Sequence, residues 1–137
     1  MENNNFINNK CNNSDECIKL LKSTKSQNRI KGNIGENLAI NYLQDNGYQI
    51  IETNYKNKIG EIDIIAKENN RIIFVEVKQR STLKFGYPRE AVNFYKQKKI
   101  RQVALSYIKY KNLINEHLRF DVIEIIGDKI THLKNAF

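Results

Sequence analysis

Two acidic residues and a lysine near the middle of the chain have types and spacing that could place them in one site. Asp63 and Glu76 are thirteen positions apart, and Lys78 follows Glu76 by two. Carboxylate oxygens are the ligands that Mg²⁺ prefers, commonly one or two of them together with a substrate phosphate. An ammonium group beside them can stabilise developing negative charge. The set predicts a metal-dependent phosphodiesterase site, provided that the fold brings the three side chains together.

The segments that carry these residues are expected to pair as a β-hairpin. Residues 59–67 and 71–79 are rich in Ile and Val, which favours strands. Asn69 and Asn70 stand between them and tolerate the positive φ angles of a tight turn. We therefore expect two neighbouring antiparallel strands joined by a two-residue turn.

This register would bring the candidate residues onto one face of the sheet. Counted from the turn, it sets Asp63 opposite Glu76 and Glu61 opposite Lys78, and both pairs share a face because side chains alternate along a strand. The other face would be apolar and ready for burial. Its expected members are Ile62, Ile64, Ala66, Ile73, Val75 and Val77.

Two carboxylates on opposed strand positions repel each other. Their Cβ atoms would lie roughly 5 Å apart, and at an effective dielectric constant of about 20 two full charges at that distance repel by roughly 3 kcal/mol. Protonation of one carboxylate or a bound cation would relieve this repulsion. We interpret Asp63 and Glu76 as a candidate metal site, and the alternative is a sheet face whose charges are simply solvated.

Helices are predicted on both sides of the hairpin in sequence. The first covers residues 33–46, ends before Gly47 and carries Glu36 in its first turn, where the helix dipole also favours a carboxylate for structural reasons. Its expected apolar stripe is Ile34, Leu38, Tyr42 and Leu43. The second helix has the stripe Ile100, Val103, Ala104, Tyr107 and Ile108.

A lysine-rich segment opens the second helix. Lys98 points away from the apolar stripe, as a solvated residue would. Lys96 lies on the stripe's own face one turn earlier, so it either leans towards the sheet and the site or snorkels to solvent. Together with Lys99, these residues are candidates for contacts with nucleic-acid phosphates, which would make binding depend strongly on salt.

The remaining segments set the limits of the domain. Residues 118–126 and 129–133 are expected to form a second hairpin around Gly127 and Asp128, with Arg119 and Asp121 paired on one face in a structural role. Residues 1–30 are Asn-rich and are expected to be disordered or to hold a short helix, and 31–137 to form one domain. The two cysteines lie in the extension and are expected to be reduced thiols.

Composition narrows the classes of function. The net charge is +8, of which +5 falls on residues 33–137, which fits attraction to a polyanion such as nucleic acid. No run of 18 apolar residues and no secretion signal is present, so we expect a soluble cytoplasmic protein that does not contact a membrane.

Five motifs in order give the chain a family resemblance from about residue 28 onwards. They are GNIGENLAINYL, GEIDIIA, FVEVKQR, GYPREAV and RFDVIEI. The sequence resembles the YraN family of small bacterial proteins, which is placed in the restriction-endonuclease-like superfamily near the archaeal Holliday-junction resolvases and other PD-(D/E)xK nucleases. The resemblance implies an α/β fold with an αβββαβ core, in which helices flank a central mixed sheet.

The resemblance also implies roles for individual residues. Glu36, Asp63, Glu76 and Lys78 would be the catalytic set, although Ile62 stands where the superfamily has a proline. Mg²⁺ or Mn²⁺ would be held by the three acidic residues and by the backbone carbonyl of residue 77, a valine (Val77).

The implied activity is that of an endonuclease. It would hydrolyse phosphodiester bonds in DNA and leave a 5′-phosphate. Branched or junction DNA, the substrate of the resolvases, is the candidate substrate, and a homodimer is the candidate form. Arg80 and the Gly-Tyr-Pro turn that follows are expected to reach the substrate backbone. The alternative is a non-catalytic module that binds nucleic acid or a protein partner while keeping a nuclease-like fold.

Overall fold

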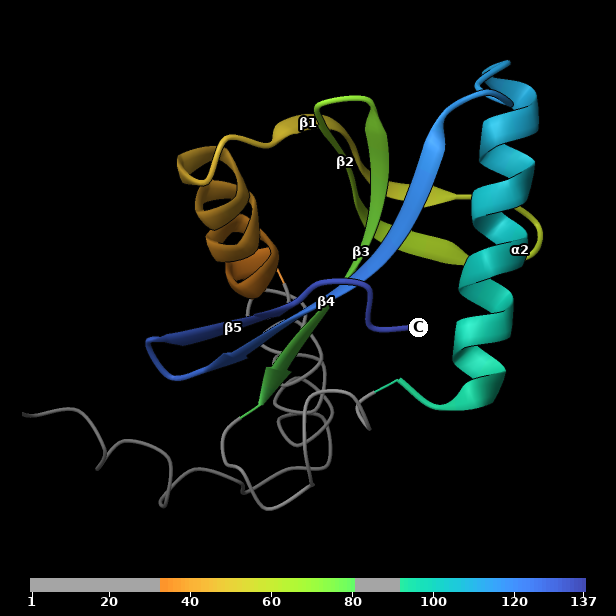
Figure 1. The fold of residues 1–137 in the computed structure, drawn as a ribbon. Coiled ribbons are helices and arrows are strands. Elements are labelled where there is room, and N and C mark those ends of the chain that lie inside the picture. The colour runs from red at the N-terminus through yellow and green to blue at the C-terminus, as the bar shows by residue number, and fades with distance from the viewer. Residues whose placement is uncertain (1–32, 81–91) are drawn as a thin grey trace, which may run out of the picture. The chain divides into compact units, whose positions relative to one another are not determined.

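Five strands form one mixed sheet in the part of the chain that the computed structural model describes, residues 33–80 and 92–137 (Figure 1). The strands lie in chain order and are β1 (Gln49–Lys56), β2 (Glu61–Glu68), β3 (Arg71–Arg80), β4 (His117–Ile126) and β5 (Lys129–Leu133). Neighbouring strands run antiparallel except β3 and β4, which are parallel. Residues 34–137 form one structural unit, to which the following description refers. The expected extension, residues 1–30, and the loop with the Gly-Tyr-Pro turn lie outside the described residues.

A helix packs on each face of the sheet, which confirms an α/β protein with a mixed sheet flanked by helices. The helix over residues 33–45, gold in Figure 1, and helix α2 (Phe94–Tyr110) lie on opposite sides of the strands. Each helix shares its own apolar cluster with the sheet. The order of elements is helix, three strands, helix and two strands, which is the order that the resemblance implies with β5 added.

The first helix ends as predicted but turns a different face to the sheet. Gly47 follows it with a φ of 85°, a left-handed conformation that glycine adopts without strain. The buried line is Gly35, Ala39 and Leu43, whereas Ile34 is 49% exposed, so the predicted stripe was wrong for its first members. Small residues let the helix lie close to the sheet, since a Cβ on Gly35 would be 2.8 Å from a side-chain oxygen of Gln79.

The predicted hairpin register is confirmed near its turn. The ladder between β2 and β3 runs from Glu68 opposite Arg71 to Ile64 opposite Val75, as the two-residue turn requires. Asn69 has a φ of 54° and supplies the left-handed turn conformation, whereas Asn70 does not share it. The Ile and Val side chains between these ends are buried, so the central part of the hairpin is a core element.

Beyond Ile64 the two strands diverge, which corrects two expectations. The direct opposition of Asp63 to Glu76 and of Glu61 to Lys78 is not part of the ladder. Ile62 packs with the α2 cluster and not with Ile64, so the predicted apolar face was wrong at this position.

The cause of this break lies in the neighbouring strand β1. Asn54 stands between the residues that pair with Ile62 and Ile64, and it has a left-handed φ of 53°. A left-handed residue interrupts the regular alternation of a strand. Tyr55 and its partner Ile62 therefore turn to the α2 side, and Asp63 lies at the point where the sheet changes face.

The second half of the domain follows the predictions. All five residues of the α2 stripe are buried against the sheet. β4 and β5 form the expected hairpin, with Gly127 at a φ of 58°. No helix among the described residues has the length and apolar character needed to cross a membrane, and the location of the protein in the cell stays a prediction.

Candidate functional site

The buried carboxylate of Glu76 holds two ammonium groups. Glu76 is only 5% exposed, and its Oε1 lies 3.1 Å from Nζ of Lys78. Nζ of Lys96 also contacts this oxygen. Glu76 and Lys78 share a strand face by alternation in β3, and Lys96 comes from the first turn of α2, one turn before the buried Ile100. The structure thus confirms that Lys96 leans towards the predicted site.

Asp63 joins this group from the opposite strand. Its Oδ2 accepts a hydrogen bond of 2.8 Å from the backbone N–H of Val77. In a continued ladder that N–H would pair with β2, so the carboxylate takes the place of a backbone acceptor where the strands diverge. The N–H and C=O of a strand residue point to the same side, and the carbonyl of Val77 therefore also points towards β2.

The fold makes the Asp63 carboxyl group hard to ionise. Burial raises its pKa from 3.8 to about 7, and the neighbouring charges of Glu76 and Glu36 raise it as well. The N–H of Val77 and the ammonium of Lys96 act in the opposite direction without cancelling the rise. Raised carboxyl pKa values of this kind, produced by burial and a like charge, are typical of functional sites.

The neighbouring carboxylates stabilise the charged form of Lys96, whereas they disfavour the charged form of Asp63. Burial alone would lower its pKa, but the hydrogen bond to Glu76 and the charge of that carboxylate outweigh burial and raise it. Lys96 is therefore a full positive charge at neutral pH. It stands beside a carboxylate that Lys78 already partners.

Glu36 is held at the edge of the cluster by a residue that the sequence did not point to. It lies in the first turn of the helix over 33–45, and its Oε2 accepts a 2.9 Å hydrogen bond from Nδ2 of Asn54. Asn54 is the left-handed residue of β1. Its one sequence signal is an asparagine inside a strand, because asparagine tolerates that backbone conformation and is otherwise uncommon there.

The described part of the chain presents two neighbouring carboxyl groups at this site and not three acidic ligands in place. Among residues 33–80 and 92–137, no three His, Cys, Asp or Glu side chains lie near enough to one another to hold a metal ion. Asp63 lies near enough to Glu76 for the charge of that carboxylate to raise its pKa, and it accepts a hydrogen bond from the N–H of Val77. One or two carboxylates suffice for Mg²⁺ when substrate phosphate and water complete the shell.

The predicted nucleic-acid contacts divide into exposed and paired residues. Lys98 and Lys99 are exposed on α2, and Nζ of Lys99 lies 5.2 Å from the centre of the Tyr95 ring. Arg80 is mostly covered, and its Nε lies 3.1 Å from Oε1 of the buried Glu124. That pairing gives Arg80 a structural role, and its contact with nucleic acid stays a prediction.

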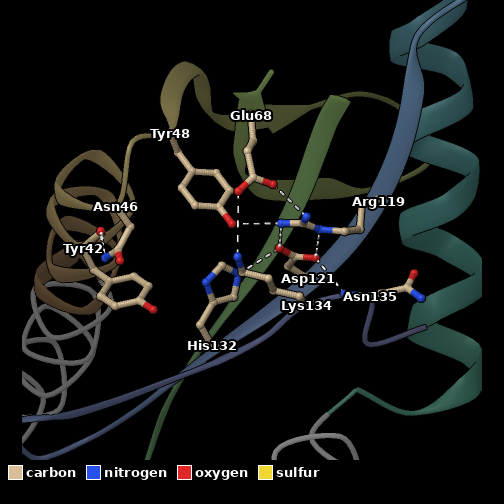
Figure 2. Close-up of polar contacts among 9 residues, drawn as sticks. All are labelled: Tyr42, Asn46, Tyr48, Glu68, Arg119, Asp121, His132, Lys134 and Asn135. Carbon is tan, nitrogen blue, oxygen red and sulfur yellow. Dashed lines mark hydrogen bonds and ion pairs between the residues drawn. The ribbon is translucent and has the colours of Figure 1, made fainter. Parts of the chain in front are cut away.

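A second polar cluster joins β4 and β5 to Glu68 of β2 and to Tyr48 (Figure 2). Arg119 donates two 2.8 Å hydrogen bonds to the fully buried Asp121, and a third to Glu68. Nε2 of His132 lies 2.8 Å from Oδ2 of the same aspartate, and the backbone N–H of Asn135 donates to its Oδ1. The predicted Arg119–Asp121 pair is confirmed.

This cluster has the properties of a structural network. Hydrogen bonds from His132 and Arg119 hold the pKa of Asp121 below its ordinary value, although burial alone would raise it. The bond to Asp121 raises the pKa of Arg119. Both carboxylate oxygens of Asp121 are used within the fold.

These observations define the class of the protein, which is an α/β protein with one candidate site. The site contains carboxyl groups and a lysine from the two diverging strands, together with side chains from the first turns of the two helices. The chain belongs to the uncharacterised protein family UPF0102, whose sequence model matches residues 35–125, and this confirms the resemblance to the YraN family.

The match with this chain covers almost the whole length of each relative. A UPF0102 protein of Clostridioides difficile is 56% identical over 112 residues, which is 80% of this chain and 98% of the relative. A UPF0102 protein of Clostridium beijerinckii is 50% identical, covering 82% of this chain and 97% of its own. One of Acetivibrio thermocellus is 48% identical, covering 82% and 95%. These names assign a family and no activity.

Proposed function

We propose that the chain is a metal-dependent endonuclease that hydrolyses phosphodiester bonds in DNA. The observation that carries this proposal is the cluster of Asp63, Glu76, Lys78 and Lys96, in which two ammonium groups share one buried carboxylate beside a second carboxyl group. A site for a metal ion and a phosphate needs groups of both signs in one place.

The arrangement of elements supports a restriction-endonuclease-like fold. The strand aspartate lies on β2, the glutamate and lysine of the E-x-K motif lie on β3, and the helix glutamate precedes β1. The parallel β4 follows α2, which completes the implied αβββαβ order. In this fold the four residues Glu36, Asp63, Glu76 and Lys78 would be the catalytic set.

Mg²⁺ or Mn²⁺ would be held by the carboxylates of Asp63 and Glu76 and by the carbonyl oxygen of Val77, with Glu36 contributing directly or through water. When bound, the cation supplies positive charge that offsets the charge developing on the phosphoryl group and favours the ionisation of water. The raised pKa of Asp63 supports this assignment, because two neighbouring carboxylates that share no cation favour protonation of one.

The lysines would act on the water and on the phosphate. Lys78 holds the attacking water, and Lys96 donates to a non-bridging phosphate oxygen; Glu76 orients both ammonium groups through its Oε1. Attack of the water oxygen on phosphorus breaks the bond to the 3′ oxygen. That oxygen takes up a proton and becomes a 3′-hydroxyl, and the product carries a 5′-phosphate.

DNA is the proposed partner because the surface beside the site is cationic. Lys98 and Lys99 are exposed on the helix that carries Lys96, and the first turn of α2 contains no acidic residue. Lysine side chains in such positions neutralise phosphates and do not read sequence. Branched or junction DNA as the substrate and a homodimer as the active form follow from the resemblance and belong to the same proposal.

A binding module without turnover is the second candidate, and one observation favours it. Glu76 is already neutralised by lysine, and among the described residues no three acidic or imidazole ligands are gathered for a metal. In this case nucleic acid would bind to the lysines and no divalent cation would be required. The two candidates therefore differ in metal binding.

The test compares cleavage by the wild type with that by Asp63→Asn and Lys78→Ala, using branched and linear DNA with Mg²⁺. We expect each substitution to lower the rate by at least about 100-fold, since each removes a group that stabilises the transition state. Glu61→Gln is the matched control, because Glu61 lies two residues from Asp63 but is exposed and pairs with Lys56. Equal cleavage by all variants would exclude this site.

Calorimetry with Mg²⁺ and Mn²⁺ separates the two candidates. Binding to the wild type that is lost in Asp63→Asn supports the enzyme. DNA binding without any divalent-cation binding in the wild type supports the module.

A further inference from the structure

Two aromatic side chains project into solvent at the start of α2, beside the candidate site. Phe94 is 76% exposed and Tyr95 is 68% exposed, while every residue of the apolar stripe of this helix is buried. Neither ring is therefore used to attach α2 to the sheet. Large aromatic rings bury much area at low entropic cost when they meet a partner.

The position of these rings relates them to the site. They come one and two residues before Lys96, so they lie within about 3 Å of it along the helix axis but are turned about 100° (Tyr95) and about 200° (Phe94) around it. Lys96 contacts Glu76, the central carboxylate of the cluster. A strand whose phosphate reaches Lys96 and that continues around the N-terminal end of α2 would therefore meet Tyr95 first and Phe94 next.

The charge around the rings indicates the chemistry of what they contact. Lys99 lies over the Tyr95 ring, and both Lys98 and Lys99 are exposed. Lysines interleaved with exposed aromatic rings are typical of surfaces that bind single-stranded nucleic acid, where the lysines follow the backbone and the rings stack on bases. A continuous duplex offers phosphates to the lysines but keeps its bases stacked on each other, so it leaves the rings without a partner.

We propose that Phe94 and Tyr95 stack on unpaired bases next to the phosphate held at the candidate site. The preferred substrate would then carry single-stranded nucleotides beside the cleaved bond, as at a flap, a gap or an opened branch point. This inference rests on the proposed function for the identity of the site. Stacking itself can be measured without cleavage.

The other end of α2 provides a matched control. Tyr110 is 78% exposed, and Nζ of Lys111 lies 5.6 Å from the centre of its ring. This aromatic and lysine pair has the same composition as Tyr95 with Lys99. It stands about 22 Å further along the helix, because each residue adds about 1.5 Å.

The experiment measures binding without divalent cations, in EDTA, so that no strand is cut. Fluorescence anisotropy follows labelled oligothymidylate and oligouridylate of about 20 nucleotides, and a blunt DNA duplex, titrated with each variant. For Phe94→Ala and Tyr95→Ala we expect affinity for single strands to fall about fivefold or more, with less than about a twofold change for the duplex. Tyr110→Ala should change neither. The ratio of the affinities for oligothymidylate and oligouridylate distinguishes a preference for DNA from a preference for RNA.

A fluorescence reporter tests stacking directly. The chain contains no tryptophan, so Phe94→Trp and Tyr110→Trp each introduce a single indole. Quenching of the first by single strands and not by duplex supports stacking. Quenching of both variants alike, or unchanged single-strand affinity in Phe94→Ala and Tyr95→Ala, overturns it.

The outcomes keep this inference apart from the proposed function. Unchanged binding in the two alanine variants, together with cleavage that depends on Asp63, overturns stacking and leaves the nuclease. Loss of single-strand binding in them, with no cleavage by the wild type, supports stacking on a binding module and overturns the nuclease.

Discussion

At the scale of single residues, the strongest sign of function is a carboxyl group whose ionised form is destabilised by its surroundings. Asp63 is half-buried near Glu76, and its pKa of about 7 means that its charged form is disfavoured in the folded protein. A residue chosen only for stability would not be an acid here. The proposed role explains the acid, because a cation or a substrate can use the charge that the fold by itself tolerates poorly.

We therefore predict that Asp63→Asn stabilises the protein above neutral pH. The folded pKa lies above the unfolded value of 3.8, so the wild type loses stability as the pH rises from about 4 through 7. Asparagine has no such loss and can still accept from the N–H of Val77. We expect a gain on the order of 2 kcal/mol at pH 8 that vanishes near pH 4.

Chemical denaturation at pH 4, 6 and 8 without divalent cations measures this effect. Glu61→Gln serves as the control, since Glu61 is an exposed acid on the same strand. A variant less stable than the wild type at pH 8 would contradict the prediction.

At the scale of elements, the sequence predicts those features that depend on local pattern. The stripe of α2 and the turn end of the β2–β3 hairpin were predictable, because helical and strand periodicities act over a few residues. The same periodicity placed Lys96 on the face of the apolar stripe and left open whether it reaches the site or the solvent; the structure shows that it contacts Glu76. Spacing therefore predicted that Asp63, Glu76 and Lys78 lie near one another, whereas Glu36 was added through the family resemblance.

Features that depend on a neighbouring strand could not be predicted in this way. The switch of Ile62 to the α2 face requires Asn54 of β1 to be left-handed, and nothing within β2 signals it. The buried face of the first helix was missed because Ile34 and Leu38 are as apolar as Leu43. The helix instead buries the face that begins with the small residues Gly35 and Ala39, because it lies close to the sheet at Gly35.

The N-terminus of α2 links helix stability to the site. The side chain of Asn93 accepts a 2.9 Å hydrogen bond from the backbone N–H of Lys96, which caps the helix at the turn that places the Lys96 ammonium on Glu76. We predict that Asn93→Ala lowers the free energy of unfolding by about 1 kcal/mol, whereas Asn93→Asp retains most of it. Urea denaturation measures the loss. A loss equally large in Asn93→Asp would contradict capping as the cause.

At the scale of the whole molecule, the Arg119 and Asp121 cluster joins distant parts of the chain. It connects β4 with β5, with Glu68 at the end of β2, with Tyr48 just before β1 and with the backbone at Asn135 (Figure 2). Buried charges held in this way depend on every partner. Loss of one partner leaves the others without compensation in a dry environment.

We predict that Asp121→Asn destabilises the protein by about 3 to 5 kcal/mol, because the buried guanidinium of Arg119 loses its main counter-charge. Asp128→Asn, at the exposed β4–β5 turn, should cost less than about 0.5 kcal/mol. Since the folded pKa of Asp121 is lowered, the wild type keeps this contribution at neutral pH and loses it as the pH falls through that value. Thermal unfolding of the three proteins at pH 7 and pH 3 is the measurement.

Net charge gives a prediction for the molecule as a binding partner. With +5 on residues 33–137, the logarithm of the DNA association constant should fall linearly with the logarithm of salt concentration. Lys98→Gln combined with Lys99→Gln should reduce the slope by about two, one for each lost phosphate contact. Lys129→Gln, an exposed lysine of β5, should leave it unchanged. Affinity that does not respond to salt would rule out phosphate contacts by these lysines.

The irregular edge strand β1 has a consequence for self-association. Its register shifts between Ile50 and Glu52, and Asn54 breaks its pleat, so its free edge does not present an even row of donors and acceptors to another chain. The distortion that places Asp63 and Glu36 thus also discourages fibril-like stacking through this edge. A regular β1 would lose the geometry that positions the site, and it would also make aggregation through this edge easier.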